Sequence, residues 1–467
     1  MSEADWGILS LLPLLATLVL AFITRSALIA MLVGTFTGTL LLGAAPGVGM
    51  NELFQSSLGN ADFIWICQIV VLIGILFELF KRAGVLGALA IRFAGGRGSR
   101  RGVELTAWGM GFVIVDDYFS PLLTGAVIRP MSDRVAIPRE KLAFILDSTT
   151  ASVCILVPFT AWGAYVASLI AAQDAYVASV DEGLAIFISA IKYNFYPILM
   201  LLFTFLMCSG LIPDFGPMRT AEKRAAASGE LIRPGGKPLV TDDGDEILEV
   251  ASGRESSLLL ELLAPIVLLV GVGAWTLVAS GSVKIVEAFM LANGWMLAVL
   301  AIRGSFSGID EVADVIVAGT KNVMGALLIV ALAYALNAVT TELGAGQYII
   351  EQFTSDLTPN TLVLITFLIT AAISFSTGTS WGAYAMMMPV ALPIAFEITA
   401  GDAGPLVFQT VAAIAGGGIF GDHASPVSDT TVLSSVGAGS DHIDHVVTQL
   451  PYAVLVATIT AGLYAWM

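Results

Sequence analysis

Charged residues are scarce in this sequence. They make up 12% of its 467 residues, whereas 57% are hydrophobic. Soluble domains carry about 25% charged residues, because water has to be kept at their surface. Too few polar groups remain here to cover a globule, so a water-soluble fold is excluded and a lipid bilayer must cover most of the surface. We expect an integral membrane protein.

Bases and cysteines are also few. Lysine and arginine number 21 against 37 acids, a formal net charge of −16, which is the opposite of what a nucleic-acid binder needs and favours acidic solvated loops. The cysteines Cys67, Cys154 and Cys208 stand singly in apolar stretches without metal-ligand spacing. No Walker motif occurs, which argues against ATP-driven pumping. We expect no enzyme activity and no cofactor.

Long apolar runs are what the sequence has in abundance. A helix needs about 20 apolar residues to span the hydrocarbon. Such runs occur near 8–24, 27–45, 63–80, 105–128, 141–171, 183–208, 258–279, 285–302, 322–339, 361–396, 404–434 and 446–466. The first run lacks the basic start and cleavage site of a secretory signal, so we expect it to be retained.

Loop charges predict how these runs cross the membrane, because Lys and Arg accumulate in cytoplasmic loops. Loop 46–62 has no base and is expected outside, whereas loops 81–101 and 129–141 are both basic and expected inside. The segment 105–128 between the two basic loops should therefore enter from the cytoplasm and turn back. In the second half, loops 341–359 and 397–403 are acidic and free of bases, so segment 361–396 should re-enter from outside.

The two halves thus have mirrored topology. Each re-entrant segment is followed by a long apolar run with a polar cluster, Asp147–Thr150 in one half and Gly421–Thr431 in the other. Broken segments in matching positions of two halves point to a transporter's site. The predicted units are a two-helix segment (1–62), a first inverted repeat (63–208), a cytoplasmic polar linker (209–257), connecting helices (258–321) and a second inverted repeat (322–467).

Carboxylates within the apolar runs are the candidate chemical groups. A charged acid at the bilayer centre costs at least ~2.5 kcal/mol on insertion scales, so it usually has a partner or a task. Asp116-Asp117, Asp147, Asp422 and Asp429 each stand beside Ser, Thr, Gly or Pro. Hydroxyls and freed carbonyls are the hard oxygen ligands that a small cation prefers. A desolvated aspartate among them can hold either Na+ or a proton.

Structural alternatives stay open for several positions. Asp116 and Asp117 could cap a half-helix, and Asp147 could cap a helix break. His423 either shuttles protons or holds Asp422 in place. His442 and His445 favour a solvated turn.

Two weaker features admit both a functional and a packing interpretation. Trp162-Gly163-Ala164-Tyr165 and Trp381-Gly382-Ala383-Tyr384 repeat the same four residues, either as a gate or as aromatic packing beside glycine. Asn337 either donates a carbonyl oxygen or bonds a neighbouring helix.

The polar stretch Gly421–Ser435 resembles the NhaC family of sodium/proton antiporters, whose usual version has Cys where Ala424 stands. Asp116-Asp117-Tyr118-Phe119 with Arg129-Pro130, Ser376–Gly382 and Asp147-Ser148-Thr149 continue the likeness. The resemblance implies an all-α polytopic fold in which two inverted repeats, each with a re-entrant hairpin and a broken helix, form scaffold and transport domains of elevator type. It also implies a homodimer in a bacterial or archaeal inner membrane, in contact with lipid.

The expected function is exchange of Na+ for H+ by alternating access. Asp422, Asp429 and Asp147 would hold Na+ or protons, with Ser425, Thr430, Ser148, Thr149, Asp117 and Asp116 contributing and with His423, Thr379, Ser380, Trp381 and Asn337 around the site or at a gate. The alternative is a Na+-coupled carrier or exchanger of a small organic acid or amino acid. An anionic substrate would need a base or a half-helix N-terminus, and no Lys or Arg lies mid-span near the clusters.

Overall fold

The computed structural model describes residues 6–24, 27–43, 46–59, 61–85, 88, 99–115, 117, 119–158, 160–173, 175–238, 256–280, 284–345, 348, 358–426 and 428–467. Within these ranges the regular structure is helical, apart from one isolated bridge between Pro238 and Asp441. The chain is therefore a nearly all-helical protein, as its composition predicts.

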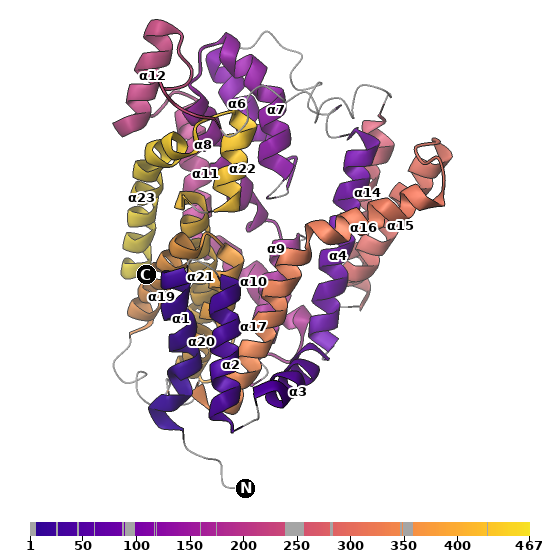
Figure 1. Ribbon diagram of the computed structural model, residues 1–467, viewed down its shortest axis with the longest axis vertical. Helices are drawn as coiled ribbons and strands as arrows, with labels where there is room; N and C mark the ends of the chain where they lie inside the picture. Colours follow the sequence, from indigo (N-terminus) through magenta and orange to yellow (C-terminus); the bar gives the residue numbers. More distant parts are fainter. Residues whose placement is uncertain are drawn as a thin grey trace.

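The helices follow one another along the whole chain (Figure 1). Their bounds are η1 Gly7–Leu11, α1 Leu12–Thr24, α2 Ala27–Leu41, α3 Pro46–Leu58, α4 Ala61–Ala83, α6 Arg100–Met110, α7 Phe119–Arg134, α8 Arg139–Cys154, α9 Ala161–Ala171, α10 Val180–Ala190, η2 Ile191–Tyr193, α11 Phe195–Cys208, α12 Gly216–Ser228, η3 Leu259–Leu263, α14 Ala264–Ser280, α15 Ile285–Ile302, α16 Ile309–Asn322, α17 Met324–Glu342, α19 Pro359–Thr377, α20 Ser380–Ile398, α21 Pro405–Ala424, α22 Asp429–Ala438 and α23 His442–Trp466.

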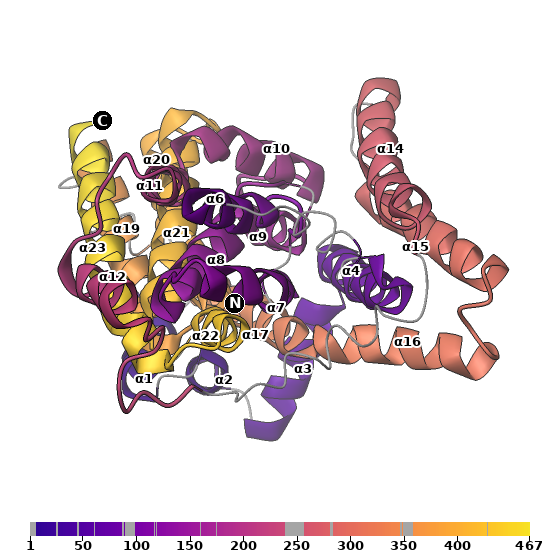
Figure 2. The ribbon, with the colours of Figure 1, turned by 90° about the horizontal axis from the view of Figure 1, so that it is seen from above.

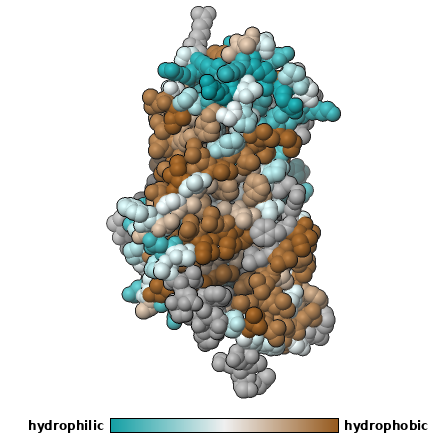
Figure 3. All heavy atoms as spheres, turned by 90° about the vertical axis from the view of Figure 1, so that its left-hand side faces the viewer, coloured by the Kyte–Doolittle hydropathy of each residue, from teal (hydrophilic) through white to brown (hydrophobic). Residues whose placement is uncertain are grey.

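Several of these helices suit a membrane. Among the described residues, five are long and apolar enough to cross one, namely Phe63–Ala83, Ile285–Ile302, Pro359–Thr377, Ser380–Ile398 and His442–Trp466. Val180–Tyr193 and Phe195–Cys208 count as a sixth if the pair, bent by 46°, is one span. One face of the molecule is mostly hydrophobic below a hydrophilic cap, which lies at the end where α6, α7 and α12 are found (Figure 3).

The helix breaks fall in the four segments where the sequence predicts them. The segment 105–128 separates into α6 and α7, and 361–396 separates into α19 and α20 at Gly378, whose φ of 72° ends α19 in the left-handed conformation. The two long runs with polar clusters also break, into α8 with α9 and α21 with α22. Thr160 and Thr379 restart α9 and α20, because each hydroxyl accepts a hydrogen bond from the backbone N–H three residues on.

Three segments expected to lie between spans are helical. Loop 46–62 contains α3, the polar linker contains α12, and α16 precedes α17. Figures 1 and 2 both show α14, α15 and α16 to one side of the body that holds α8 and α19–α23, with α4 between them. There α16 packs closely on α4, since a Cβ on Gly319 would come within 2.7 Å of the Gly74 carbonyl oxygen.

Candidate functional site

Asp422 lies in the last turn of α21 and is only 2% exposed. Its Oδ2 accepts a hydrogen bond from Ser380 Oγ at 2.7 Å, and its Oδ1 accepts from Ser428 Oγ at 2.5 Å and Thr430 Oγ1 at 3.3 Å. Ser380 begins α20, whereas Ser428 directly precedes α22 and Thr430 lies in the first turn of α22. One carboxylate thus joins the second arm of the α19–α20 hairpin to both parts of the broken helix α21–α22.

Asp147 lies in the middle of α8 and is 1% exposed. Its Oδ2 accepts from Gln449 Nε2 at 3.0 Å and lies 3.6 Å from His445 Nε2. Gln449 Nε2 also donates to the His423 carbonyl oxygen at 2.7 Å. Gln449 of α23 therefore bridges the two aspartate-bearing helices, α8 and α21.

All three histidines of the chain gather around these groups. His423 Nδ1 shares a hydrogen bond of 3.0 Å with Tyr196 Oη. Ser435 Oγ bonds His445 Nδ1 at 2.9 Å and His442 Nδ1 at 3.1 Å. The expected solvated turn at 442–445 is instead the first turn of α23, with His445 fully buried, because Asp441 caps this helix by accepting from two backbone N–H groups.

Thr430 contacts Asp422 as predicted, whereas the other three predicted hydroxyl ligands donate to backbone carbonyl oxygens. Ser425 Oγ donates to the Phe375 carbonyl oxygen at 2.7 Å. Ser148 and Thr149 donate to the Ile145 carbonyl oxygen of their own helix, and Ser148 also accepts from Thr204. Such local hydrogen bonds are usual for Ser and Thr inside a helix. A ligand role for these three residues stays a prediction.

The remaining predicted acids differ in how far the structure describes them. Asp117 is half-buried in the break between α6 and α7. Asp116 lies outside the described residues. Asp429 begins α22, and its side chain lies outside the described part.

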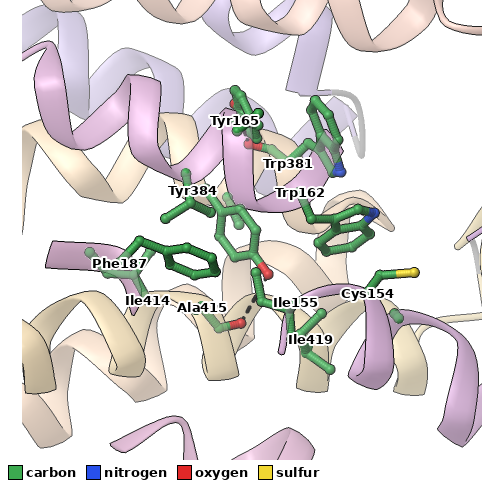
Figure 4. Close-up of a cluster of buried hydrophobic side chains, with 14 of the residues drawn as sticks. Cys154, Ile155, Trp162, Tyr165, Phe187, Trp381, Tyr384, Ile414, Ala415 and Ile419 are labelled. Atoms are coloured by element: carbon green, nitrogen blue, oxygen red, sulfur yellow. Dashed lines mark hydrogen bonds between the residues drawn. The ribbon is translucent and has the colours of Figure 1, made fainter. Parts of the chain in front are cut away.

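The two Trp-Gly-Ala-Tyr copies pack against each other (Figure 4). The rings of Tyr165 and Trp381 stack with centroids 4.2 Å apart, and Trp162 meets both Trp381 and Tyr384 edge-on. Tyr165 Oη donates to the Trp381 carbonyl oxygen, and Tyr384 Oη donates to the Ala415 carbonyl oxygen. The packing interpretation therefore accounts for both copies.

The other residues expected around the site have ordinary helix contacts. Thr379 caps α20. Asn337 Nδ2 donates to the Ala172 carbonyl oxygen at 2.9 Å, so the described contact of Asn337 goes to the end of α9.

The basic group that faces Asp147 is the imidazole of buried His445, 3.6 Å away. Among the described residues, Lys141 is the one buried lysine or arginine. Its Nζ lies 3.2 Å from Glu104, 3.0 Å from Asp214 and 3.1 Å from Glu222, so its charge is already compensated. A buried carboxylate is stabilised by hydrogen bonds, a proton or a cation, so Asp147 and Asp422 are the groups of this region able to take up a proton or a cation.

A strap, defined as residues 229–238, crosses the ends of two site helices. Arg139 N donates to the Leu231 carbonyl oxygen at the start of α8. At the start of α23, Arg233 Nε pairs with Asp444 at 2.9 Å and Lys237 N donates to Asp441 at 2.7 Å. Burial acts to raise the pKa of Asp441, but backbone N–H donors from Lys237 and from the first turn of α23 outweigh it and hold that pKa below its usual value.

Three residues in contact with the aspartates were not predicted from the sequence. Ser428 stands inside the polar stretch that the sequence singles out, so its position was an available signal. His445 and Gln449 follow His442 at helical spacing within an apolar run, which places all three on one side of a helix. This helical spacing of His442, His445 and Gln449 was the available signal that α23 begins at this point.

Known proteins resemble this chain at three levels. The sequence pattern of the Na+/H+ antiporter family matches residues 153–467. An uncharacterized protein of Haemophilus influenzae is 32% identical over 98% of this chain and 90% of its own length. The malate-2H(+)/Na(+)-lactate antiporter of Bacillus subtilis is 33% identical over 36% of this chain and 35% of its own length. In fold, the chain is similar to the YdaH transporter of Alcanivorax borkumensis, with a TM-score of 0.53 and 15% identity over 90% of this chain and 88% of that one.

Proposed function

Because this chain belongs to the Na+/H+ antiporter family, we propose that it exchanges Na+ for H+ across the cell's inner membrane. The observation that carries the proposal is the pair of buried carboxylates, Asp422 at the break between α21 and α22 and Asp147 in the middle of α8. Gln449 links Asp147 directly to the helix that carries Asp422, and the imidazole of His445 lies 3.6 Å from Asp147.

Exchange follows from competition at these acids. A carboxylate surrounded by hydroxyl and amide groups can bind Na+ through oxygen or bind a proton, but not both at full strength. Thr430, together with Ser428, supplies hydroxyls beside Asp422. Asp429, at the start of the same helix, is proposed as the third acid. A site that releases Na+ when it takes up a proton on one side, and the reverse on the other, couples the two gradients.

Alternating access is proposed to arise from two inverted repeats. The order α4, α6–α7, α8–α9, α10–α11 is matched by α17, α19–α20, α21–α22, α23. This agreement in order supports one helical hairpin and one broken helix in each half of the chain. The loop charges predict that the two halves have opposite orientations in the membrane. An elevator-type movement of a transport domain within a homodimer belongs to the same proposal.

A Na+-coupled carrier of a small organic acid is the second candidate. The Bacillus relative's name favours it, and the start of α20 lies beside Asp422, where a helix N-terminus attracts an anion. The one buried Lys or Arg among the described residues, Lys141, is already paired with three acids, which weighs against this candidate.

The test uses purified protein in sealed liposomes that hold a pH-sensitive dye, with Na+ added outside and no organic solute. We expect Na+-dependent proton movement that disappears in Asp422→Asn and persists in Asp402→Asn, a matched change in an exposed loop. A melting curve of the Asp422 variant separates loss of transport from loss of fold. Movement only after malate or an amino acid is supplied would replace the proposal with the coupled carrier.

A further inference from the structure

We propose that His442, Ser435 and His445 form a proton relay between the polar end of the molecule and the buried carboxylate of α8. This inference rests on the proposed function and names the path of its proton. Ser435 Oγ bonds His442 Nδ1 at 3.1 Å and His445 Nδ1 at 2.9 Å. On its other side, the fully buried ring of His445 turns Nε2 toward Asp147 Oδ2, 3.6 Å away.

The outer end of the relay is partly exposed. His442 is half-buried in the first turn of α23. Asp441 and Asp444 flank it, and they bond Lys237 and Arg233 of the strap. The strap belongs to the linker that the loop charges predict to be cytoplasmic, so the relay would open to the cytoplasmic side.

The contacts of His442 fix where its ring carries hydrogen. Its Nε2 lies 2.7 Å from the Pro426 carbonyl oxygen, which can only accept, so Nε2 carries a hydrogen. In the neutral ring, Nδ1 then has a lone pair and accepts from the Ser435 hydroxyl. Because that hydroxyl has a single hydrogen, its oxygen must accept from Nδ1–H of His445. A lone pair is then left on His445 Nε2, toward Asp147.

A proton added to His442 reverses this order. Nδ1 of His442 then donates to Ser435, and the hydroxyl hydrogen turns to His445 Nδ1 or to the Thr431 carbonyl oxygen, 2.9 Å away. When His445 Nδ1 accepts, the ring carries its hydrogen on Nε2, facing the ionised Asp147. Transfer moves one hydrogen across each contact: Nε2–H to the carboxylate, the hydroxyl hydrogen to His445, and Nδ1–H of His442 to Ser435. Imidazolium and carboxylate become imidazole and carboxylic acid, and no hydrogen is gained or lost.

The last contact of the relay is the longest. A distance of 3.6 Å exceeds that of a hydrogen bond by about 0.4 Å, so transfer needs a small approach of the two side chains. Gln449 lies beside His445 and holds the carboxylate in place, because its amide donates to the same Oδ2 at 3.0 Å. The hydroxyls of Thr431 and Ser434 also act on Asp147. Both are fully buried, so neither opens the carboxylate to the surface.

The test compares two exchange reactions in liposomes. Na+/Na+ exchange, followed with radioactive Na+, needs the cation site but no proton, whereas Na+/H+ exchange needs both. We expect Ser435→Ala to slow Na+/H+ exchange about tenfold or more and to leave Na+/Na+ exchange near the wild-type rate. Thr448→Val is the matched control and should keep both rates, since the buried Thr448 hydroxyl bonds only the His445 carbonyl oxygen among the described contacts.

Each contrary result has a distinct meaning. Equal loss of both exchanges in Ser435→Ala would overturn the relay and make Ser435 a structural residue. Normal Na+/H+ exchange in this variant would also overturn it, because protons would then take another path.

The ring tautomers test the relay without transport. The chain has three histidines, so NMR of protein with 15N-labelled histidine rings resolves His442 directly. We expect hydrogen on Nε2 of its neutral ring, and a ring protonated at Nδ1 alone would refute the inference. If the tautomer is as expected but wild-type liposomes show no Na+/H+ exchange, the proposed function fails and the hydrogen-bonded chain stands.

Discussion

The contact between α7 and α22 allows a prediction about how closely the α6–α7 pair must pack against the helices of the site. A Cβ on Gly437 would lie 2.2 Å from the Pro121 carbonyl oxygen, and one on Gly125 would lie 2.4 Å from the Gly437 carbonyl oxygen. A carbon–oxygen contact needs about 3.3 Å, so Gly437→Ala must push the helices apart by about 1 Å. Both obstructing atoms belong to backbone, which cannot rotate away.

The expected cost is overpacking of about 1–3 kcal/mol, of which the better helix propensity of alanine offsets up to about 1 kcal/mol. Because Thr430 is in the first turn of α22 and bonds Asp422 at 3.3 Å, the displacement should also disturb the site. We therefore expect Gly437→Ala to lower both the melting temperature in detergent and the Na+-dependent proton flux in liposomes.

Gly109→Ala is the matched control for this prediction. Gly109 lies in α6 of the same hairpin, and a Cβ there meets nothing within 4 Å. This variant should be neutral or slightly stabilised, with normal flux. If Gly437→Ala melts and transports like Gly109→Ala, the close packing of α7 on α22 is not what positions the site, and the reasoning fails.

Two further predictions concern the polar end of the molecule. Arg224 pairs with the buried Glu140 carboxylate at 2.9 Å. Arg224→Ala should lower the free energy of unfolding by about 3–5 kcal/mol, because it leaves this carboxylate without its partner. An equal loss on removing the exposed Arg219 would contradict this reasoning. The lowered pKa of Asp441 means that its contribution to stability is present above the unfolded pKa of about 3.9 and is lost as pH falls through the lower folded value. Asp441→Asn should remove this component from the melting temperature measured against pH, and an unchanged profile would show that Asp441 does not hold the strap.

The five described helices that are long enough to cross a membrane overlap predicted apolar runs, because hydropathy over about 20 residues reports burial in lipid directly. The breaks could be predicted because Gly378, with Thr and Ser around it, interrupts an apolar run. Helices α3, α12 and α16 were missed, since a short surface helix needs no long apolar run. The charges of the loops predict on which side of the membrane each loop lies. They do not predict whether a loop contains a helix.

The aspartates of the site were predictable, but most of their partners were not. Asp147 and Asp422 are conspicuous in apolar surroundings, whereas the Asp147–Gln449 contact joins residues 302 positions apart. Spacing along the chain does not say which hydroxyl faces an acid and which bonds its own helix. Thr430 does the first and Thr149 does the second, although both stand beside an aspartate cluster.

The two Trp-Gly-Ala-Tyr copies bear on how the proposed repeat is to be aligned. One copy opens α9 and the other opens α20, and in the proposed repeat these helices correspond to α22 and α7. The copies are therefore not equivalent positions; they are the two sides of one contact. The equivalent contact, between α22 and α7, is made by Gly437 and Gly125 through backbone. Aromatic rings fill the contact between α9 and α20, whereas glycines allow the close contact between α22 and α7. In the proposed repeat, these two equivalent helix pairs therefore meet through residues of very different size.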